Sequence, residues 1–338
     1  MQKLTSPADS PLIRVVFVTM DTHVASAVER ARIRLSKQIP NLSLYVHAAS
    51  EFSSDPQALS ACIRDIERGD IIIATMLFME DHFNSILPAL AKRRSQCDAM
   101  VCALSTGEVT KLTRIGAFDM SAPANAAMAL LKKLRGSGNK SASAGANQMK
   151  MLKRLPKILK FIPGTAQDVR AYFISLQYWL AGSEENMVNL VLHLVDRYAD
   201  GPRRSLRGTL KAKPPVEYPE TGLYHPRMAS PIGEDLSKVP VPEGGYKATI
   251  GLLLMRSYVL AQNAGHYDGM IHALEARGLR VIPAFAAGLD ARPAIETYFM
   301  KNGQPVIDGL VSLMGFSLVG GPAYNDAQAA EDILTRLD

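Results

Sequence analysis

The sequence predicts an α/β protein with an N-terminal doubly wound, mostly parallel sheet, a helical neck, and then the beginning of a second, truncated α/β sheet. Two observations predict this order. Runs of β-branched and apolar residues alternate with amphipathic helical segments in the first third of the chain, and the same alternation restarts near residue 247. Between these regions lie a polar small-residue stretch, a helical region, and a segment rich in proline and glycine.

The first region carries four strand patterns separated by helix patterns. Asp21 and Thr22 are good N-caps for the first helix, and Asp55-Pro56 places a capping Asp before Pro at the first helical position of the second. In chain order we expect strands at Ile13–Met20, Leu42–His47, Asp70–Phe78 and Ala99–Leu104, and helices at His23–Gln38, Pro56–Gly69 and Glu80–Arg94. Short helical crossovers make such strands parallel and cover both faces, so we expect residues 1–135 to fold as an independent domain.

The middle of the chain contains no strand pattern. The small polar residues of Gly136–Asn147 predict a flexible linker. Its Lys140 lacks the preceding glycine that a phosphate-binding loop requires, so we reject that motif. Residues 148–246 are expected to form a helical neck followed by a Pro-rich irregular connection. The expected helices are Met151–Phe161, Asp168–Leu180 and Ser183–Tyr198, the last with Ser183 as its cap, and the connection is Asp200–Tyr246.

Residues 247–338 alternate strands and helices again. The expected strands are Ala248–Met255, Leu279–Phe285 and Val306–Leu313, and the expected helices are His266–Arg277, Arg292–Met300 and Asp326–Leu337. No strand pattern follows the last helix. Two interpretations stay open: the start of a larger sheet, or a small three-stranded domain.

The distribution of charge and the cysteine content indicate which partners and which cellular compartment to expect. The formal charge of +6 is uneven: Lys132–Lys213 holds 16 Lys/Arg against 5 Asp/Glu, a local net of +11, so the remainder is −5. Such a basic middle predicts either a surface for an anionic partner or an ordinary solvated helix face. No nucleic-acid-binding motif accompanies it. Three irregularly spaced cysteines, a polar N-terminus and the lack of a 20-residue apolar run predict a cytoplasmic protein without a membrane span.

A few residues are candidates for binding a ligand. Arg256 follows a predicted strand at its carboxyl end, where α/β sheets bind ligands, and His225 lies in an irregular Tyr-His-Pro turn. Gly320 and Gly321 allow close backbone approach to a ligand or form a plain turn. Trp179, the only tryptophan, lies in an aromatic group that fits either a helix–helix core or the face of a flat macrocycle. We identify no catalytic residue and no metal site.

Several segments, taken together and in this order, resemble the large subunit of magnesium chelatase, which shares a family with the large subunit of cobaltochelatase. The resemblance runs from about Ile13 to Asp338. It is carried by LTRIGAFDM at Leu112–Met120, LPKILKFIP at Leu155–Pro163, AQDVRAYFISLQYWLAG at Ala166–Gly182, IGLLLMRS at Ile250–Ser257, GHYDGMIHALEARG at Gly265–Gly278, VIPAFAAGLD at Val281–Asp290 and VSLMGFSLVGGP at Val311–Pro322.

The resemblance implies the N-terminal part of a porphyrin-binding subunit about four times longer. It implies ATP-dependent insertion of Mg²⁺ into protoporphyrin IX for (bacterio)chlorophyll synthesis, with two ATPase subunits as partners that use the ATP. On this interpretation the chain is part of an enzyme complex but is inactive alone. The alternatives are a non-catalytic docking or regulatory module for those ATPase subunits, and a two-lobed ligand-binding protein of the periplasmic type, which the absence of a signal peptide disfavours.

Overall fold

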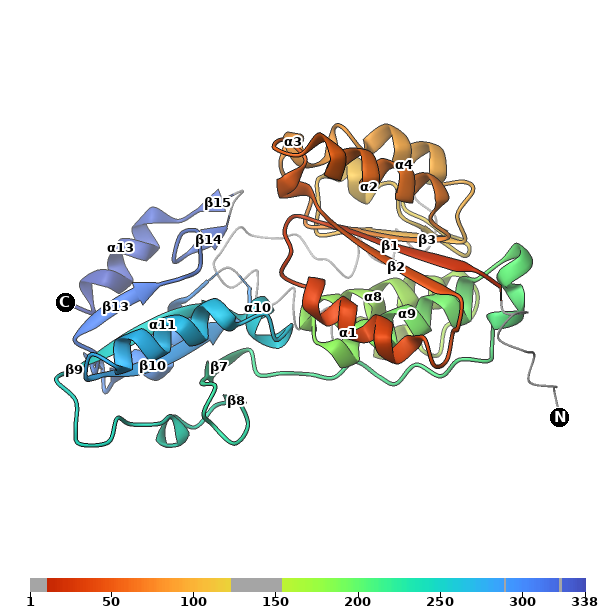
Figure 1. Ribbon diagram of the computed structural model, residues 1–338. Helices are drawn as coiled ribbons and strands as arrows, with labels where there is room; N and C mark the ends of the chain where they lie inside the picture. The colour runs from red at the N-terminus through yellow and green to blue at the C-terminus, as the bar shows by residue number, and fades with distance from the viewer. Residues whose placement is uncertain (1–10, 123–153, 289, 322–323) are drawn as a thin grey trace. The chain divides into compact units, whose positions relative to one another are not determined.

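The computed structural model describes residues 11–122, 154–288, 290–321 and 324–338. The contact pattern divides the chain into two compact units, Met1–Val216 and Glu217–Asp338. Both units are α/β, as predicted (Figure 1). Among the described residues, no helix combines the length and the apolarity that crossing a membrane demands.

The first unit is built on a six-stranded sheet in the order β2-β1-β3-β4-β5-β6. The four long strands are parallel, and the two short ones continue the sheet as an antiparallel edge. The strands are β1 (Ile13–Thr19), β2 (Leu42–Ala48), β3 (Ile71–Thr75), β4 (Ala99–Ala103), β5 (Arg114–Ile115) and β6 (Phe118–Asp119). The four predicted strands are thus confirmed, and the antiparallel edge is an addition to them.

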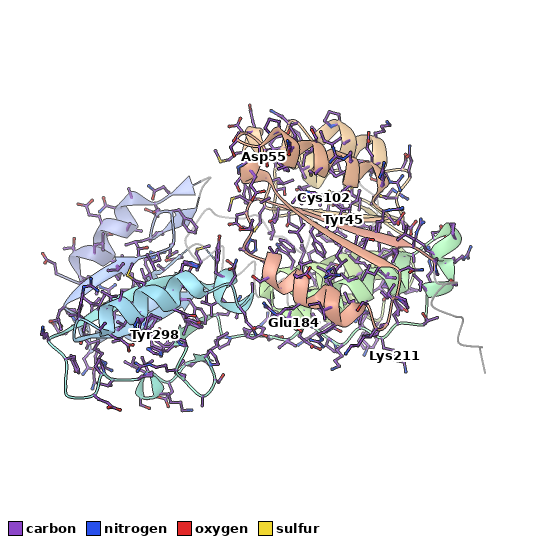
Figure 2. All side chains as sticks on the ribbon, in the orientation of Figure 1. Tyr45, Asp55, Cys102, Glu184, Lys211 and Tyr298 are labelled. Atoms are coloured by element: carbon purple, nitrogen blue, oxygen red, sulfur yellow. The ribbon has the colours of Figure 1, made fainter. Side chains whose placement is uncertain are left out.

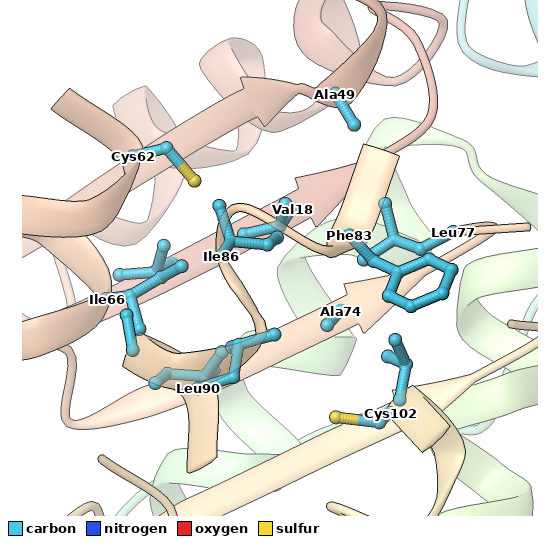
Figure 3. Close-up of a cluster of buried hydrophobic side chains, with 14 of the residues drawn as sticks. Val18, Ala49, Cys62, Ile66, Ala74, Leu77, Phe83, Ile86, Leu90 and Cys102 are labelled. Carbon is cyan, nitrogen blue, oxygen red and sulfur yellow. The ribbon is translucent and has the colours of Figure 1, made fainter. Parts of the chain in front are cut away.

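One face of this sheet is covered by the helices that follow β2 and β3. These are α2 (Pro56–Arg68), α3 (Glu80–Phe83) and α4 (Leu87–Arg93), the last two replacing one expected helix. The predicted Asp55 cap is present, accepting hydrogen bonds from the backbone N–H groups of Gln57 and Ala58. Figure 3 shows the buried cluster beneath them, in which Cys62, Ile66 and Leu90 pack on Val18, Ala74 and Cys102 of the strands.

The opposite face is covered by α1 (Ala25–Leu35), α8 (Thr165–Ala181) and α9 (Glu184–Tyr198) (Figure 1). The hydroxyl of Ser183 caps α9, as predicted, whereas the expected Asp21 and Thr22 caps do not hold α1, which begins after Val24. Figure 2 places Asp55 and Glu184 on opposite sides of the sheet. The helices expected to form a neck therefore complete the first unit, which extends past the boundary expected at residue 135.

A cluster of charged side chains joins the segment after α9 to the residues that precede β3 and β4. After α9, a 3₁₀ turn at Gly201–Leu206 brings Arg203 to Asp98, with Nε and Nη2 each donating over 2.9 Å. Arg203 Nη1 also lies 3.3 Å from Asp70, which directly precedes β3. Burial raises the pKa of the Asp70 carboxyl despite the nearby arginines. Part of the basic middle of the chain therefore pairs with acidic groups of the same unit.

The second unit contains a five-stranded sheet in the order β13-β9-β10-β7-β8. Its parallel strands β9 (Ala248–Met255), β10 (Leu279–Ala286) and β13 (Gly309–Ser312) match the three predicted strands. The prediction for Asp200–Tyr246 was incomplete, because this connection supplies β7 (Thr221–Tyr224) and β8 (Ile232–Gly233), which pair antiparallel in the sheet. The sheet therefore has five strands where the sequence predicted three.

The helices of the second unit divide between the two faces of its sheet. α10 (Arg256–Leu260) and α11 (Gly265–Glu275) follow β9 and pack on Leu252, Leu254 and Phe285. The other face is covered by α12 (Arg292–Ala294), a π-helical turn at Ile295–Phe299, and α13 (Ala327–Thr335). The chain also forms two small hairpins, β11 (Met300–Lys301) with β12 (Gln304–Pro305) and β14 (Gly320–Gly321) with β15 (Tyr324–Asn325).

Candidate functional site

The carboxyl ends of β9 and β13 form the topological switch point of the second sheet. These strands are neighbours, yet α11 follows β9 on one face and α13 follows β13 on the other. Doubly wound sheets bind ligands where successive connections diverge in this way, outside the carboxyl ends of the strands. The residues at this edge are therefore the candidate site.

Arg256 lies at this point, directly after β9. Its Nε donates to the carbonyl oxygen of Pro219 over 2.8 Å, and its Nη2 donates to that of Tyr218 over 3.2 Å. Burial lowers the pKa of the guanidinium, an effect that Glu220 opposes. A cation taken out of water, with backbone carbonyl oxygens among its partners, favours the approach of an anion.

The loops that follow β10 and β13 meet at the same edge of the sheet. The backbone N–H of Ala291 donates to the carbonyl of Leu318 over 2.8 Å, and Asp290 forms an isolated bridge with Val319. Gly320 follows at φ 116°, a conformation that favours glycine, and starts the short β14 strand with Gly321. The two glycines therefore lie in a loop hydrogen-bonded to the edge that carries Arg256.

An aspartate–arginine pair reinforces the first of these loops. Arg292 Nη2 donates to Asp290 Oδ2 over 2.7 Å, and its Nε donates to Asp290 Oδ1 over 3.0 Å. The backbone N–H of Arg292 also donates to Asp290 Oδ1. This bidentate pair orders the loop after β10.

His225 lies elsewhere, although it belongs to the same unit. Thr221 is opposite Ala286, which is opposite Met255, so β7 begins at the candidate edge and runs away from it. His225, four residues further on, is roughly 13 Å along the strand direction from that edge. The structure therefore does not bring His225 and Arg256 together.

The contacts of His225 are those of a packed residue. Its side chain is fully buried, its Nδ1 accepts from the Arg227 backbone N–H over 3.2 Å, and its Nε2 lies 3.2 Å from Glu275 Oε1. The acceptor role of Nδ1 fixes the neutral tautomer in which Nε2 donates to Glu275. His225 thus ties the end of β7 to the end of α11.

This arrangement predicts an acid-sensitive contribution of His225 to stability. Burial lowers the pKa of His225, with Glu275 opposing the shift. A lowered folded-state pKa gives stability that is present above the unfolded value of about 6.5 and is lost as the pH falls below it. We expect the free energy of unfolding of the second unit to fall more steeply below pH 6.5 in the wild type than in His225→Gln, measured by urea unfolding between pH 7.5 and 5.

At pH 7.5, urea unfolding of His225 variants measures what the hydrogen bonds of His225 contribute to stability. His225→Ala removes the partner of the Arg227 N–H and one partner of Glu275, and it should cost about 1–3 kcal/mol. His225→Gln keeps an N–H donor and should cost less. Parallel pH profiles for wild type and His225→Gln would contradict a neutral, buried imidazole.

Trp179 belongs to the first unit and lies in its core. The indole is 4% exposed, stacks on Phe17 at a centroid distance of 6.2 Å and meets the edge of the His23 ring at 5.9 Å. Trp179 therefore packs α8 against β1 within the first unit, whereas Arg256 and the glycines belong to the second.

Within the described ranges, no group of three or more His, Cys, Asp or Glu side chains is arranged to hold a metal ion. The candidate edge offers a guanidinium, a paired aspartate and glycine backbone, which suits binding of an anionic group.

Sequence reasoning missed two parts of this edge. The strand β7 is only four residues long and is embedded in proline-rich sequence. Its Gly222 was the available signal, because a Cβ there would come within 2.5 Å of the Phe285 ring. The Asp290–Arg292 pair was also missed, since two charges two residues apart look like ordinary loop residues.

Comparison with family models divides the chain near residue 175. Residues 14–173 match a domain of unknown function (DUF3479), and residues 176–338 match the family described as CobN/Magnesium Chelatase. The boundary between the two families falls within α8, whereas the structural units divide after Val216.

Curated relatives match almost the whole chain. It is 47% identical over 99% of its length to the magnesium-chelatase H subunit of Cereibacter sphaeroides and 48% identical over 96% to that of Rhodobacter capsulatus. The chloroplastic magnesium-chelatase ChlH subunit of Oryza sativa is 30% identical over 97% of the chain. The chain spans 28%, 27% and 24% of these relatives, respectively.

Among solved structures, the catalytic subunit of cobaltochelatase from Mycobacterium tuberculosis is similar over 89% of this chain and 18% of its own, with a TM-score of 0.41 and 15% identity.

Proposed function

We propose that the chain, whose residues 176–338 match the family described as CobN/Magnesium Chelatase, forms part of the porphyrin-binding subunit of magnesium chelatase. That complex would insert Mg²⁺ into protoporphyrin IX for (bacterio)chlorophyll synthesis in the cytoplasm, as an ATP-dependent ligase. The observation that carries the proposal is 47% identity to a magnesium-chelatase H subunit over 99% of this chain.

Metal insertion requires several chemical steps, and the residues of this chain suit some of them better than others. Mg²⁺ dehydrates reluctantly, and two pyrrole N–H protons must be removed by bases before it can enter the macrocycle. The porphyrin also carries two propionates, which basic groups recognise. Arg256 and the Gly320–Gly321 loop fit recognition of the substrate better than removal of its protons.

We assign Arg256 to one propionate. A guanidinium has five N–H donors, and a carboxylate competes favourably for them with neutral carbonyls such as those of Tyr218 and Pro219. Its place at the switch point supports this role. Mg²⁺ and protoporphyrin IX are substrates of the complex, and two ATPase subunits would consume the ATP.

A porphyrin titration tests this assignment. We expect protoporphyrin IX to bind the 338-residue chain, with a shift of its Soret absorbance, and Arg256→Gln to weaken binding about tenfold, or about 1.4 kcal/mol. The matched control is Arg277→Gln, because Arg277 is exposed and its guanidinium donates to the carbonyl of Ala273 in α11, which ends just before it.

A porphyrin without propionates separates recognition from misfolding. Etioporphyrin should bind wild type and Arg256→Gln equally. If Arg256→Gln weakened the binding of protoporphyrin IX and of etioporphyrin equally, the substitution would have damaged the fold of the second unit. An unchanged protoporphyrin affinity would show that Arg256 does not contact a propionate.

We further predict that this chain, as the sole large component with the ATPase subunits, ATP and Mg²⁺, forms no Mg-porphyrin. The chain spans 28% of the magnesium-chelatase relative from Cereibacter sphaeroides, and its described residues include no group of three or more His, Cys, Asp or Glu side chains arranged to hold a metal ion. Appearance of the visible bands of Mg-protoporphyrin would contradict this. The full-length subunit in the same assay is the positive control.

Docking to the ATPase subunits is the second candidate function, and one surface favours it. Phe161 is 83% exposed, Ile158 and Ile162 are also exposed, and Lys157 and Lys160 lie among them. Exposed apolar residues grouped in this way are typical of protein interaction sites. Loss of ATPase-subunit binding in Phe161→Ser, with porphyrin affinity unchanged, would assign docking to this surface.

A further inference from the structure

The first sheet has a switch point of its own, between β1 and β3. The strand order places β1 beside β3, while α1 follows β1 on one face and α3 and α4 follow β3 on the other (Figure 1). Sheets of this kind bind ligands outside the carboxyl ends of such a pair of strands. The last residues of the two strands are Thr19 and Thr75.

Both threonine hydroxyls are buried and lack a hydrogen-bond partner among the described residues. Thr19 is 0% exposed, Thr75 is 1% exposed, and neither Oγ1 meets a donor or acceptor in the part of the chain that the structure describes. Val18 is opposite Ala74 in the parallel register, so Thr19 and Thr75 are the next opposed pair, and both point to the face that carries α8. Unpartnered buried hydroxyls are uncommon, and two on adjacent strands at a ligand-binding position need an explanation.

Two further polar atoms in the segments that follow β3 and β4 also lack a partner. His82 Nδ1, in the helix after β3, and Thr106 Oγ1, after β4, are also buried and find no hydrogen-bond partner within the described ranges. Met76 and Leu104, directly after β3 and β4, have φ of 61° and 50°, which non-glycine residues seldom adopt. Such outliers concentrate at ligand-binding sites.

The charge of this edge is negative in a chain of formal charge +6. The loops after the four parallel strands, at residues 20–24, 49–54, 76–84 and 104–112, carry Asp21, Glu51, Glu80, Asp81 and Glu108 against Lys111. Five carboxylates and one lysine give a net of −4, which repels anions.

Apolar side chains accompany these charges. Met79 and Leu104 are exposed, and Trp179 contacts the His23 ring, which itself lies against Asp21. Thioether and aromatic groups adapt to the apolar body of a small ligand, and carboxylates and hydroxyls accept hydrogen bonds from a cation.

We propose that the carboxyl edge of β1 and β3 is a binding site for a small organic amine, whose protonated nitrogen is hydrogen-bonded by Thr19 and Thr75. The proposal concerns residues of the first unit and does not rest on the role proposed for Arg256 in the second. It gives a function to the unpartnered hydroxyls in the region that matches a domain of unknown function.

The single tryptophan makes the test specific, because fluorescence excited at about 295 nm reports on Trp179 alone. The probes are three molecules of similar size and different charge: 2-phenylethylamine, 2-phenylethanol and phenylacetate. We expect the amine to change the fluorescence in a saturable way and to bind at least about tenfold more tightly than phenylacetate, with the alcohol between them.

Two variants remove the hydroxyls without changing shape. Thr19→Val and Thr75→Val should each weaken the amine about tenfold. Because each also removes an unpartnered buried polar group, each should raise the melting temperature by about 2–4 °C. Lower affinity with higher stability is a combination that damage to the fold cannot produce.

Thr113→Val is the matched control. Thr113 is equally buried, but its hydroxyl donates to the carbonyl of Cys102 over 2.7 Å and accepts from the Cys102 N–H over 3.0 Å. It should lower the melting temperature and leave amine affinity unchanged.

Three outcomes would overturn the proposal. Phenylacetate binding as tightly as the amine would show an anion site. Unchanged affinity in both valine variants would place any amine site elsewhere. No saturable change with any probe, together with lower melting temperatures in both valine variants, would show that the hydroxyls are structural. The porphyrin proposal is tested by Arg256→Gln and this one by the threonine variants, so failure of one can be distinguished from failure of the other.

Discussion

A fragment ending at residue 135 is expected to lose cooperative unfolding, whereas a fragment ending at Val216 should keep it. The face of the first sheet that carries Phe17 and Phe118 is covered by α8 together with α1 and α9, and Trp179 and Tyr172 of α8 contact those two rings. Without α8 and α9, the part of that face around Phe17 and Phe118 is open to water. Burial of apolar area, at about 25 cal/mol per Å², is the main stabilising contribution to such a sheet.

Polar contacts are lost in the same truncation. Arg30 and Arg34 of α1 pair with Glu184 at 3.0 and 3.1 Å, and Asp168 accepts from the Ala117 N–H over 2.9 Å. The Arg203 clamp on Asp98 is also removed, leaving buried Asp98 and Asp70 short of compensating charge.

Thermal unfolding followed by circular dichroism, with dye binding to exposed apolar surface, compares the two fragments. We expect a broad transition and strong dye binding for the shorter one, and a sharp transition with weak dye binding for the longer. A sharp transition for the fragment ending at residue 135 would support the domain boundary expected from the sequence.

Trp179→Ala is expected to lower the free energy of unfolding of the first unit by about 3–5 kcal/mol. The indole is 4% exposed and fills the space between Phe17 and His23, so alanine leaves a cavity between α8 and β1. Since a domain is stable by roughly 5–15 kcal/mol, this is a large part of the total.

Urea unfolding measures the effect, and Trp179→Phe provides the control. Phenylalanine retains stacking on Phe17 and should cost less than alanine. Protoporphyrin affinity of the second unit should be the same in both variants under native conditions. A loss of porphyrin affinity in Trp179→Phe, with stability retained, would instead support the macrocycle role that the sequence left open.

The parts of the fold that sequence predicted well are those with strong local signals. Ile13–Thr19 and Ala248–Met255 are continuous apolar strands, and Asp55 and Ser183 cap their helices as expected. The family resemblance also identified the class of protein, which the identity to magnesium-chelatase subunits supports.

The parts that could not be predicted depend on long-range packing. An amphipathic helix such as α9 shows which residues it buries, but not the sheet on which it packs. Of the candidate residues, Arg256 was placed by a positional rule and lies where that rule puts it. Trp179 and His225 were chosen by residue type, and residue type alone does not separate a core aromatic or a hydrogen-bonded histidine from a ligand.

The pairing of β7 has a consequence for synthesis of the chain on the ribosome. Leu223 of β7 is opposite Ala284 of β10, 61 residues later, and among the described strands β7 has no hydrogen bonds to β9. At about 5–20 residues per second, β10 is made roughly 3–12 s after β7. During that interval β7 can pair within the sheet only with the short β8, so its polar backbone stays hydrated while β9 and α11 are translated. The prolines of Asp200–Tyr246 are the reason that β7 was not predicted from the sequence. They also oppose β-pairing of this segment with other strands before β10 has been synthesised.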